Sequence, residues 1–271
     1  MIASSGRVSG AALHETDCAE RSARSGSRCQ GCAVRNIALF SALQSADLDD
    51  LPLPIDDLQF SNGQELFQEG DRQGWLYTIK IGLVKLDRAP IDGALRVARL
   101  AQRGDLIGLE ACISAPYFYR ATAISSVRVC RIGVETIRLL ERDTPTLRRD
   151  LIERWCRALR DTDDFSTLLG TGTPTTRLAR LLLKMADPLF GETFAMPKRE
   201  DLGAIAGMRL ETASRVIAAL LRDGLIEKIG PRFYRLDRAA MELRLLPQPG
   251  MRSKGRRVQR IAPTSQHGQT L

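Results

Sequence analysis

The 271-residue sequence predicts an α+β chain composed of an N-terminal β-roll, a long helix and a C-terminal winged helix-turn-helix. Three observations lead to this fold class. Glycines at regular intervals separate short apolar or alternating runs over residues 55–132, which is typical of an all-β barrel or sandwich. Apolar residues then recur at helical spacing over 134–169. Two short helical patterns joined by a glycine-containing turn, followed by a hairpin pattern, occupy 198–236.

The two ends of the chain, residues 1–35 and 247–271, lack this periodicity. The first is rich in small polar residues and contains Cys18, Cys29 and Cys32, so we expect a flexible cysteine-containing segment. The second is basic and contains no acidic residue, and we expect a disordered tail. The chain as a whole carries a net charge of +8, which suits a polyanionic partner.

Neither a membrane span nor a secretion signal is expected. No run of about 18 apolar residues occurs, and residues 1–28 lack the apolar core of a signal peptide. We therefore expect no membrane partner and a cytoplasmic location, where structural disulfides are rare.

We assign residues 36–133 to the β-roll, because glycines there supply the positive φ that tight turns need. These are Gly63, Gly70, Gly82, Gly93, Gly104 and Gly108. An enzyme on a cupin-like barrel would need clustered histidine and carboxylate ligands, but the histidines, His14 and His267, lie near the chain ends. No catalytic Ser-His-Asp set, P-loop or dinucleotide-binding glycine motif is apparent either, so we predict that the protein is not an enzyme.

Residues 134–169 follow with a helical pattern. Leu147, Leu151, Trp155 and Leu159 recur every four residues and form one apolar stripe, with charged residues around it. The stripe fits either a helix packed on its own barrel or a coiled-coil-like helix that pairs with a second copy. We predict the second structure, a dimerisation helix, because the stripe is long and flanked by charges.

Three carboxylates end this helical pattern, at Asp161, Asp163 and Asp164. In a parallel dimer they would approach their symmetry mates, and repulsion between like charges would weaken the pairing. The sequence therefore predicts a weak dimer whose association an effector can control. The alternative is that the carboxylates are fully solvated and the dimer is constitutive.

Residues 173–240 contain the pattern of the winged helix-turn-helix. Thr173 or Thr175 can cap a helix that follows the break near Gly170. A short helix then ends at Gly207, and a second helix runs from Leu210 to about residue 222. A hairpin that turns at 230–231 completes the motif as a wing.

The second helix of the motif has an apolar face and a polar face. Glu211, Ser214 and Arg215 share the polar face, because they stand at i, i+3 and i+4. Arginine pairs with guanine, glutamate accepts from cytosine and serine adapts to several bases, so this face suits the major groove of double-stranded DNA. The cations placed for phosphate contacts are Lys198, Arg199, Arg209 and Arg232. A solvated helix face with an intrahelical Glu–Arg pair is the alternative; the wing and the basic flanks favour DNA.

Four phrases in order resemble the Crp/Fnr family of bacterial transcription factors, named after the cyclic-AMP receptor protein and the fumarate-nitrate regulator. They are Leu-Phe-Gln-Glu-Gly-Asp at 66–71, the run at 76–82, Arg-Gly-Asp-Leu-Ile-Gly at 103–108, and the Glu-Thr-x-Ser-Arg of 211–215. The resemblance covers about residues 36–236. It implies a β-roll of the cyclic-nucleotide-binding type, a homodimer on DNA, and RNA polymerase as a partner. A scaffold protein with a converted helix-turn-helix is the remaining alternative, against which the intact 211–215 run argues.

The recognition helix is similar to that of the Fnr-type branch of the family. Leu210 stands where the cyclic-AMP type has an arginine, and Ser214 precedes Arg215. This resemblance implies half-sites like TTGAT, in which Leu210 meets a thymine methyl group. Binding of a cyclic nucleotide is not expected, because Arg120 is the one candidate for its phosphate and lacks the serine that should follow.

The oxygen-sensing members of this family hold a [4Fe-4S] cluster on three N-terminal cysteines and one cysteine after the barrel. Cys29 and Cys32 match two of the N-terminal ligands and Cys130 matches the distal one, but Ala38 stands where the third is expected. We predict that Cys18 supplies the fourth thiolate and that the regulator responds to oxygen or redox state. The alternatives are a cluster of lower nuclearity, a zinc site, thiol redox sensing, or ordinary thiols in a regulator without a metal cluster.

Overall fold

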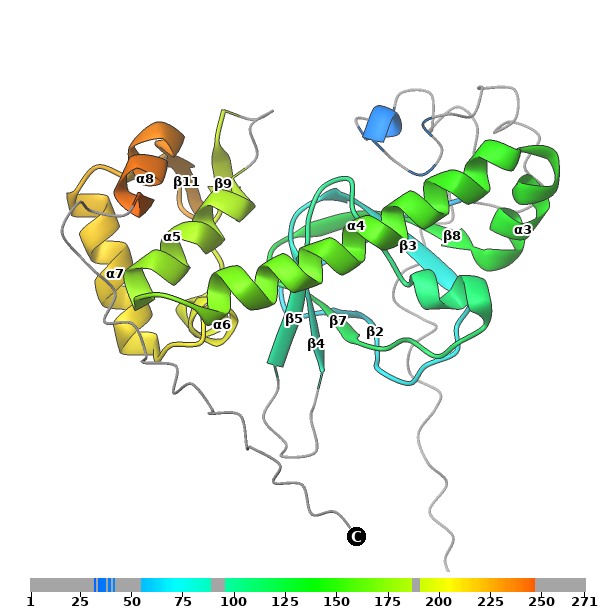
Figure 1. The fold of residues 1–271 in the computed structure, drawn as a ribbon, viewed down its shortest axis with the longest axis horizontal. Helices are drawn as coiled ribbons and strands as arrows, with labels where there is room; N and C mark the ends of the chain where they lie inside the picture. The colour runs from blue at the N-terminus through cyan, green and yellow to red at the C-terminus, as the bar shows by residue number, and fades with distance from the viewer. Residues whose placement is uncertain are drawn as a thin grey trace, which may run out of the picture.

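Figure 1 shows a β-roll and a helical domain that are joined by one long helix, α4 (Pro145–Gly170), which lies along the roll. This computed structural model describes residues 32, 34–37, 39, 41, 55–88, 96–186 and 191–246. No helix in that part of the chain is long and apolar enough to cross a membrane. The α+β architecture predicted from the sequence is confirmed.

Two antiparallel four-stranded sheets form the β-roll, with strand orders β1-β8-β3-β6 and β2-β7-β4-β5. Side chains such as Leu76, Val84 and Val129 form its buried core. The elements are η1 (Arg35–Ile37), β1 (Asp56–Phe60), β2 (Glu65–Phe67), β3 (Trp75–Ile81), β4 (Val84–Arg88), β5 (Arg96–Ala101), β6 (Leu106–Ile107), η2 (Leu109–Ile113), β7 (Arg120–Ala123) and β8 (Val127–Gly133).

Two of the predicted turn glycines are required by close backbone approaches. Gly82 has a φ of +94°, and a Cβ atom there would collide with the backbone of Ser126. Gly108 has a φ of +78°, and a Cβ atom would lie 2.7 Å from the carbonyl oxygen of Trp75. Only glycine adopts this backbone without a clash, so these positions fix the corners of the roll.

The segment predicted as one helix over 134–169 is two helices, α3 (Val134–Asp143) and α4 (Pro145–Gly170). Thr144 separates them with φ −131° and ψ 87°, far from helical values. The cause is Pro145, because a proline ring disfavours helical backbone in the residue before it but is favoured as the first residue of the next helix. The single-helix prediction is therefore wrong at Thr144.

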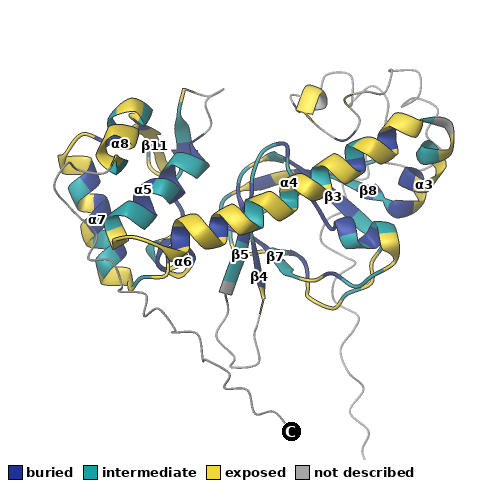
Figure 2. Ribbon diagram, in the orientation of Figure 1, coloured by how far each residue is buried: buried dark blue, intermediate teal, exposed yellow. Residues whose placement is uncertain are grey.

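The apolar stripe predicted for dimerisation is divided between two environments. Leu147 and Leu151 are only 2% and 7% exposed and belong to the core of the β-roll. Trp155 and Leu159 are 37% and 61% exposed. Figure 2 shows that exposed residues, in yellow, recur along α4. A step of four residues advances about 40° around a helix, so three steps turn the stripe by roughly 120°. The prediction that Leu147 and Leu151 face a partner is thus wrong, because they pack on the chain's own barrel.

The helical domain contains a three-stranded sheet of order β10-β11-β9 beside four helices. Its first helix is capped by Thr173, whose hydroxyl accepts from the Thr176 amide at 3.2 Å. Strand β9 and helix α8 are additions that the sequence patterns did not indicate. The elements are α5 (Pro174–Met185), β9 (Thr193–Ala195), α6 (Arg199–Ile205), α7 (Leu210–Arg222), β10 (Ile226–Lys228), β11 (Phe233–Leu236) and α8 (Arg238–Leu245).

The two domains share a packed junction. Leu83, Leu100 and Ile124 of the β-roll join the same buried cluster as the helical domain's core, to which α4 adds Phe165 and Leu169. The end of α4 is also tied to α5 within the chain, because Asp161 and Lys184 form an ion pair of 2.9 Å. Asp161 is therefore compensated within its own chain, whereas Asp163 and Asp164 are exposed. The expected repulsion between symmetry mates stays a prediction.

Candidate nucleic-acid interface

Helices α6 and α7 form the predicted helix-turn-helix, and two glycines shape its turn. Gly207 adopts a φ of +61° in the turn, a backbone that favours glycine. Gly203 lies under the start of α7, where a Cβ atom would be 2.7 Å from the carbonyl oxygen of Met208. The Met208 amide donates to the Gly203 carbonyl at 2.8 Å, so the close approach is also hydrogen-bonded. The sequence identified the turn but not the role of Gly203.

Arg177 of α5 holds this turn in place. Its guanidinium donates to the carbonyl oxygens of Ala206 at 2.9 Å and Gly207 at 3.1 Å. Carbonyls at the end of a helix have no partner within that helix, so a side-chain donor satisfies them. The sequence analysis missed Arg177, because its partners are about 30 residues away and no local pattern links them.

One side of helix α7 is buried in the helical domain, and the other side faces solvent. Ala213, Val216, Ile217 and Leu220 are buried against the rest of the domain, as the spacing predicts. Burying each of the larger side chains contributes about 1.5–3 kcal/mol. This packing fixes the rotation of the helix and decides which residues face outward.

The outward side of α7 carries the residues predicted to read bases. Glu211 and Arg215 are exposed, Ser214 is partly exposed, and Leu210 is exposed at the start of the helix. Arg215 donates a long hydrogen bond of 3.5 Å to the Thr212 hydroxyl, and among the described residues no carboxylate pairs with it. The alternative of an intrahelical Glu211–Arg215 pair is therefore not what the structure contains, and the guanidinium remains available to an external acceptor.

The predicted phosphate-contacting cations divide into two groups. Arg209 precedes α7 and Arg232 lies in the wing hairpin between β10 and β11; both are exposed. Lys198 is exposed at the start of α6. Arg199 is only partly exposed, and one of its terminal nitrogens is buried with no hydrogen-bond partner. Three of the four cations are therefore exposed, whereas Arg199 is partly buried.

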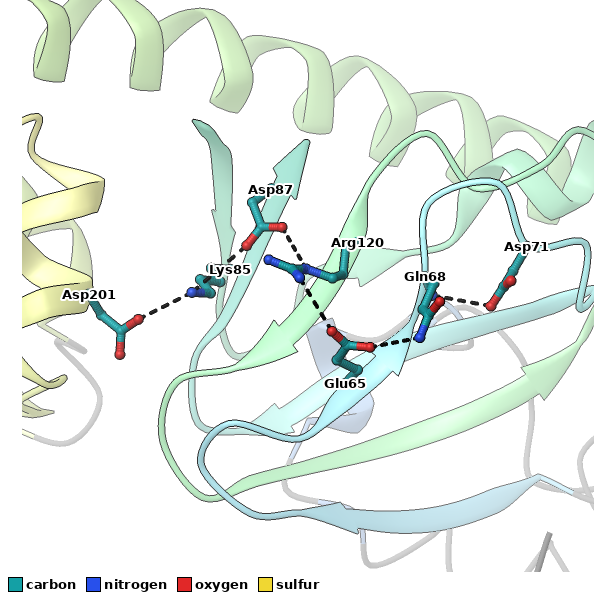
Figure 3. Close-up of polar contacts among 7 residues, drawn as sticks. All are labelled: Glu65, Gln68, Asp71, Lys85, Asp87, Arg120 and Asp201. Carbon is teal, nitrogen blue, oxygen red and sulfur yellow. Dashed lines mark hydrogen bonds and ion pairs between the residues drawn. The ribbon is translucent and has the colours of Figure 1, made fainter. Parts of the chain in front are cut away.

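Arg120 does not offer a free charge to a nucleotide phosphate. Its Nε donates to Asp87 at 2.9 Å and its Nη1 lies 3.5 Å from Glu65, as Figure 3 shows. The hydrogen bond to Asp87 raises the pKa of Arg120 further above its usual range. Two carboxylates therefore already compensate this guanidinium, and an incoming phosphate would have to displace them.

The four proposed cluster ligands fall partly outside the described residues, where Cys18, Cys29 and the expected ligand position at Ala38 lie. Cys32 is partly exposed and precedes η1, and Cys130 lies in β8 between Asp57 of β1 and Thr78 of β3. Neither Cys32 nor Cys130 forms a disulfide. The described residues contain no group of three or more ligating side chains that could hold a metal ion.

Comparisons with known proteins match both domains. A Crp-like helix-turn-helix domain matches residues 176–244, and a cyclic nucleotide-binding domain matches residues 57–143. The nitrogen fixation regulation protein FixK of Bradyrhizobium diazoefficiens is 29% identical over 220 residues, which cover 79% of this chain and 92% of FixK. The transcriptional activator protein Anr of Pseudomonas aeruginosa is 26% identical over 216 residues, covering 77% of this chain and 88% of Anr.

A solved structure supports the same relationship. FixK2 from Bradyrhizobium japonicum aligns with a TM-score of 0.62 and 25% identity, over 70% of this chain and 97% of FixK2. Fold and site together define a DNA-binding transcription regulator with a cyclic-nucleotide-binding-type domain. The chain belongs to the Crp/Fnr family, in its Fnr-type branch, and is a regulator rather than an enzyme.

Proposed function

We propose that the regulator binds inverted repeats of TTGAT-like half-sites as a homodimer and responds to oxygen or redox state. The observation that carries the DNA target is the outward face of α7, where Glu211 and Arg215 are exposed beside Ser214. Arg215 is assigned to the guanine of the half-site, Glu211 to a cytosine amino group, and Leu210 to a thymine methyl group.

The proposed dimer face is the middle of α4. Ile152, Trp155 and Leu159 are exposed there, between the residues that α4 gives to the two cores. Large apolar residues clustered along one helix are typical of a protein interface, and a second copy of α4 offers the same surface in a two-fold arrangement. A homodimer matches an inverted repeat, because each helix-turn-helix reads one half-site.

A sensor role for the cysteine-containing segment is supported by a contact between α4 and η1, which directly follows that segment. Arg154 of α4 donates to the carbonyl oxygen of Ile37 in η1 at 2.9 Å and to that of Gly104 at 3.3 Å. Burial lowers the pKa of the Arg154 guanidinium, which needs these acceptors to offset its lost hydration. A movement of the segment near Cys32 would therefore be transmitted through Arg154 to α4, next to the proposed dimer face.

We propose Cys18, Cys29, Cys32 and Cys130 as the ligands of a [4Fe-4S] cluster. Thiolate sulfur is the ordinary donor for such clusters, and a cluster bound there supplies an oxygen-sensitive tie between the N-terminal segment and β8. The chain's own residues complete the connection, because Arg154 links that segment to α4. The alternative is a regulator of the same family without a metal cluster, whose dimer is constitutive or answers to another effector.

A cyclic nucleotide is not the proposed effector, because Arg120 already forms ion pairs with Asp87 and Glu65. RNA polymerase is the proposed protein partner, as expected of a transcription regulator that acts at promoters. We place the protein in the cytoplasm because its target is DNA.

The test is a binding titration with the full chain purified and kept without oxygen. A fluorescent duplex with two TTGAT half-sites in inverted repeat should bind about 10³-fold or more tightly than a scrambled duplex at the same salt concentration. Equal affinity for both duplexes contradicts the proposed DNA target.

The sensor proposal has its own readout in the same preparation. Anaerobic protein should carry iron and sulfide with a visible absorption band, and Cys130→Ala should lack them while retaining the fold. Iron-free protein that is dimeric and binds the repeat as tightly as the anaerobic preparation removes the cluster proposal and favours the constitutive regulator.

A further inference from the structure

A chain of ion pairs leads from the β-roll to the helix-turn-helix. Figure 3 shows it on strands β2, β7 and β4 and on helix α6. The joined atoms are 3.5 Å apart between Glu65 and Arg120, 2.9 Å between Arg120 and Asp87, 3.8 Å between Asp87 and Lys85, and 3.2 Å between Lys85 and Asp201. The last pair crosses from one domain to the other.

The buried member of this chain is Asp87, whose side chain is only 2% exposed. A buried carboxylate is costly unless cations compensate it, so Arg120 and Lys85 are held on either side. The sheet register supports this arrangement, because Asp87 pairs with Arg120, and Lys85 with Thr122, across β4 and β7. Contacts within the β-roll therefore position Lys85 for its ion pair with the helical domain.

The contact between Lys85 and Asp201 is partly buried. Their side chains are 19% and 18% exposed. The apolar junction beside them is formed by Leu100 of β5 and by Leu83 and Ile124, which adjoin β4 and β7. Among the described residues, no other ion pair joins the β-roll to helices α5–α8. The Lys85–Asp201 ion pair and this apolar contact thus hold the helix-turn-helix on the β-roll, in addition to the contacts between α4 and α5 that include Asp161 and Lys184.

This orientation leaves the reading face uncovered. Arg209, Glu211 and Arg215 are exposed while Asp201 of the preceding helix is held by Lys85. A dimer on an inverted repeat needs its two reading helices about 34–36 Å apart, so each must be held at a defined angle on its β-roll. Fixing that angle before binding reduces the ordering cost of association.

We propose that Lys85 and Asp201 are positioning residues for DNA recognition, which fix the helix-turn-helix on the β-roll and thereby set the spacing of half-sites that the dimer accepts. Asp87 and Arg120 anchor Lys85 within the sheet. This role rests on the proposed function, namely a homodimer on an inverted repeat. It also assigns the β-roll a part in DNA recognition that requires no bound effector.

The experiment compares Lys85→Gln and Asp201→Asn with Lys85→Arg, which keeps the charge. Arg88→Gln is the matched control, because it removes a cation of the same strand whose pair with Glu69, 2.9 Å apart, stays within the β-roll. Each full-length protein is titrated with duplexes whose TTGAT half-sites are separated by a series of spacings. Hydrogen–deuterium exchange of α6 is measured on the same proteins without DNA.

Lys85→Gln and Asp201→Asn should bind the best-spaced duplex about fivefold more weakly, as expected for a half-buried ion pair, and discriminate less between spacings. Exchange in α6 should be faster in both, whereas Lys85→Arg and Arg88→Gln should match the wild type. Unchanged exchange and unchanged spacing preference in Lys85→Gln overturn the positioning role. If α6 exchanges faster but the wild type binds no repeat, the interdomain contact is supported and the proposed function fails.

Discussion

Helices α4 and α7 are both amphipathic, but they use their apolar residues differently. Helix α7 buries Ala213, Val216, Ile217 and Leu220 within one domain and leaves a mainly polar face outward. Helix α4 gives Leu147 and Leu151 to the β-roll and Phe165 and Leu169 to the helical domain, and it leaves the apolar residues between them exposed. The uncovered apolar residues of α4 are the basis of the proposed dimer face, and the outward polar residues of α7 are the basis of the proposed reading face.

Length explains much of the difference. Helix α7 has 13 residues and packs on one neighbouring core, so one face stays buried throughout. Helix α4 has 26 residues and passes from one core to another, and its apolar residues rotate around the axis along the way.

The largest effect is expected at the buried end of α4. Leu151→Ala should lower the free energy of unfolding by about 2–5 kcal/mol, because it opens a cavity in the β-roll core. Urea denaturation measures this, with Leu243→Ala as the control, since Leu243 is exposed and its change should stay within about 0.5 kcal/mol. Equal, small losses in the two variants would place Leu151 outside the core.

A substitution in the exposed part of α4 should affect dimerisation rather than folding. Leu159→Asp should leave the folding of the monomer intact but weaken dimerisation by about 2 kcal/mol or more, because it places a charge in the proposed interface. Sedimentation velocity across a concentration series gives the dimer dissociation constant, and Leu243→Asp is the control away from α4. A Leu159→Asp protein as dimeric as the wild type would remove this face from the interface.

Sequence periodicity was sufficient to predict features that depend on local packing, but not those that depend on contacts between distant segments. The reading face at Glu211 and Arg215 follows from spacing within a single helix, and the strands of the roll follow from turn glycines. The break at Thr144 was predictable from Pro145, but the stripe of apolar residues obscured it. The partners of Leu151, of Lys85 and of Arg177 depend on segments distant in the chain, which local patterns do not encode.

A smaller effect is expected at the wing, which should hold DNA without reading it. Arg232→Ala should weaken binding to cognate and scrambled duplexes alike and reduce the slope of log affinity against log salt by about 1, because one phosphate contact is lost. Titrations at several salt concentrations measure both quantities. A selective loss on the cognate duplex would instead make Arg232 a base-reading residue.

The smallest effect is expected in a comparison of two thiols, Cys112 in η2 and Cys156 on α4. Burial raises the pKa of Cys112 to about 11, so at pH 8 only about one in a thousand of these side chains is the reactive thiolate. Cys156 is exposed on α4. Iodoacetamide followed by mass spectrometry should therefore label Cys156 well before Cys112 in the folded protein, and both in urea. Equal labelling rates in the folded protein would contradict the burial of Cys112.

The central claim, that α7 reads bases through Arg215, is tested most directly by a cycle of one protein change and one DNA change. Wild type and Arg215→Ala are titrated with the inverted repeat and with a repeat in which the guanine of each half-site is replaced by adenine. The wild type should lose about 1–3 kcal/mol for each replaced guanine. Arg215→Ala should bind the two duplexes equally, because the group that distinguishes them is gone. An Arg215→Ala protein that discriminates as strongly as the wild type would contradict the assignment of the reading face.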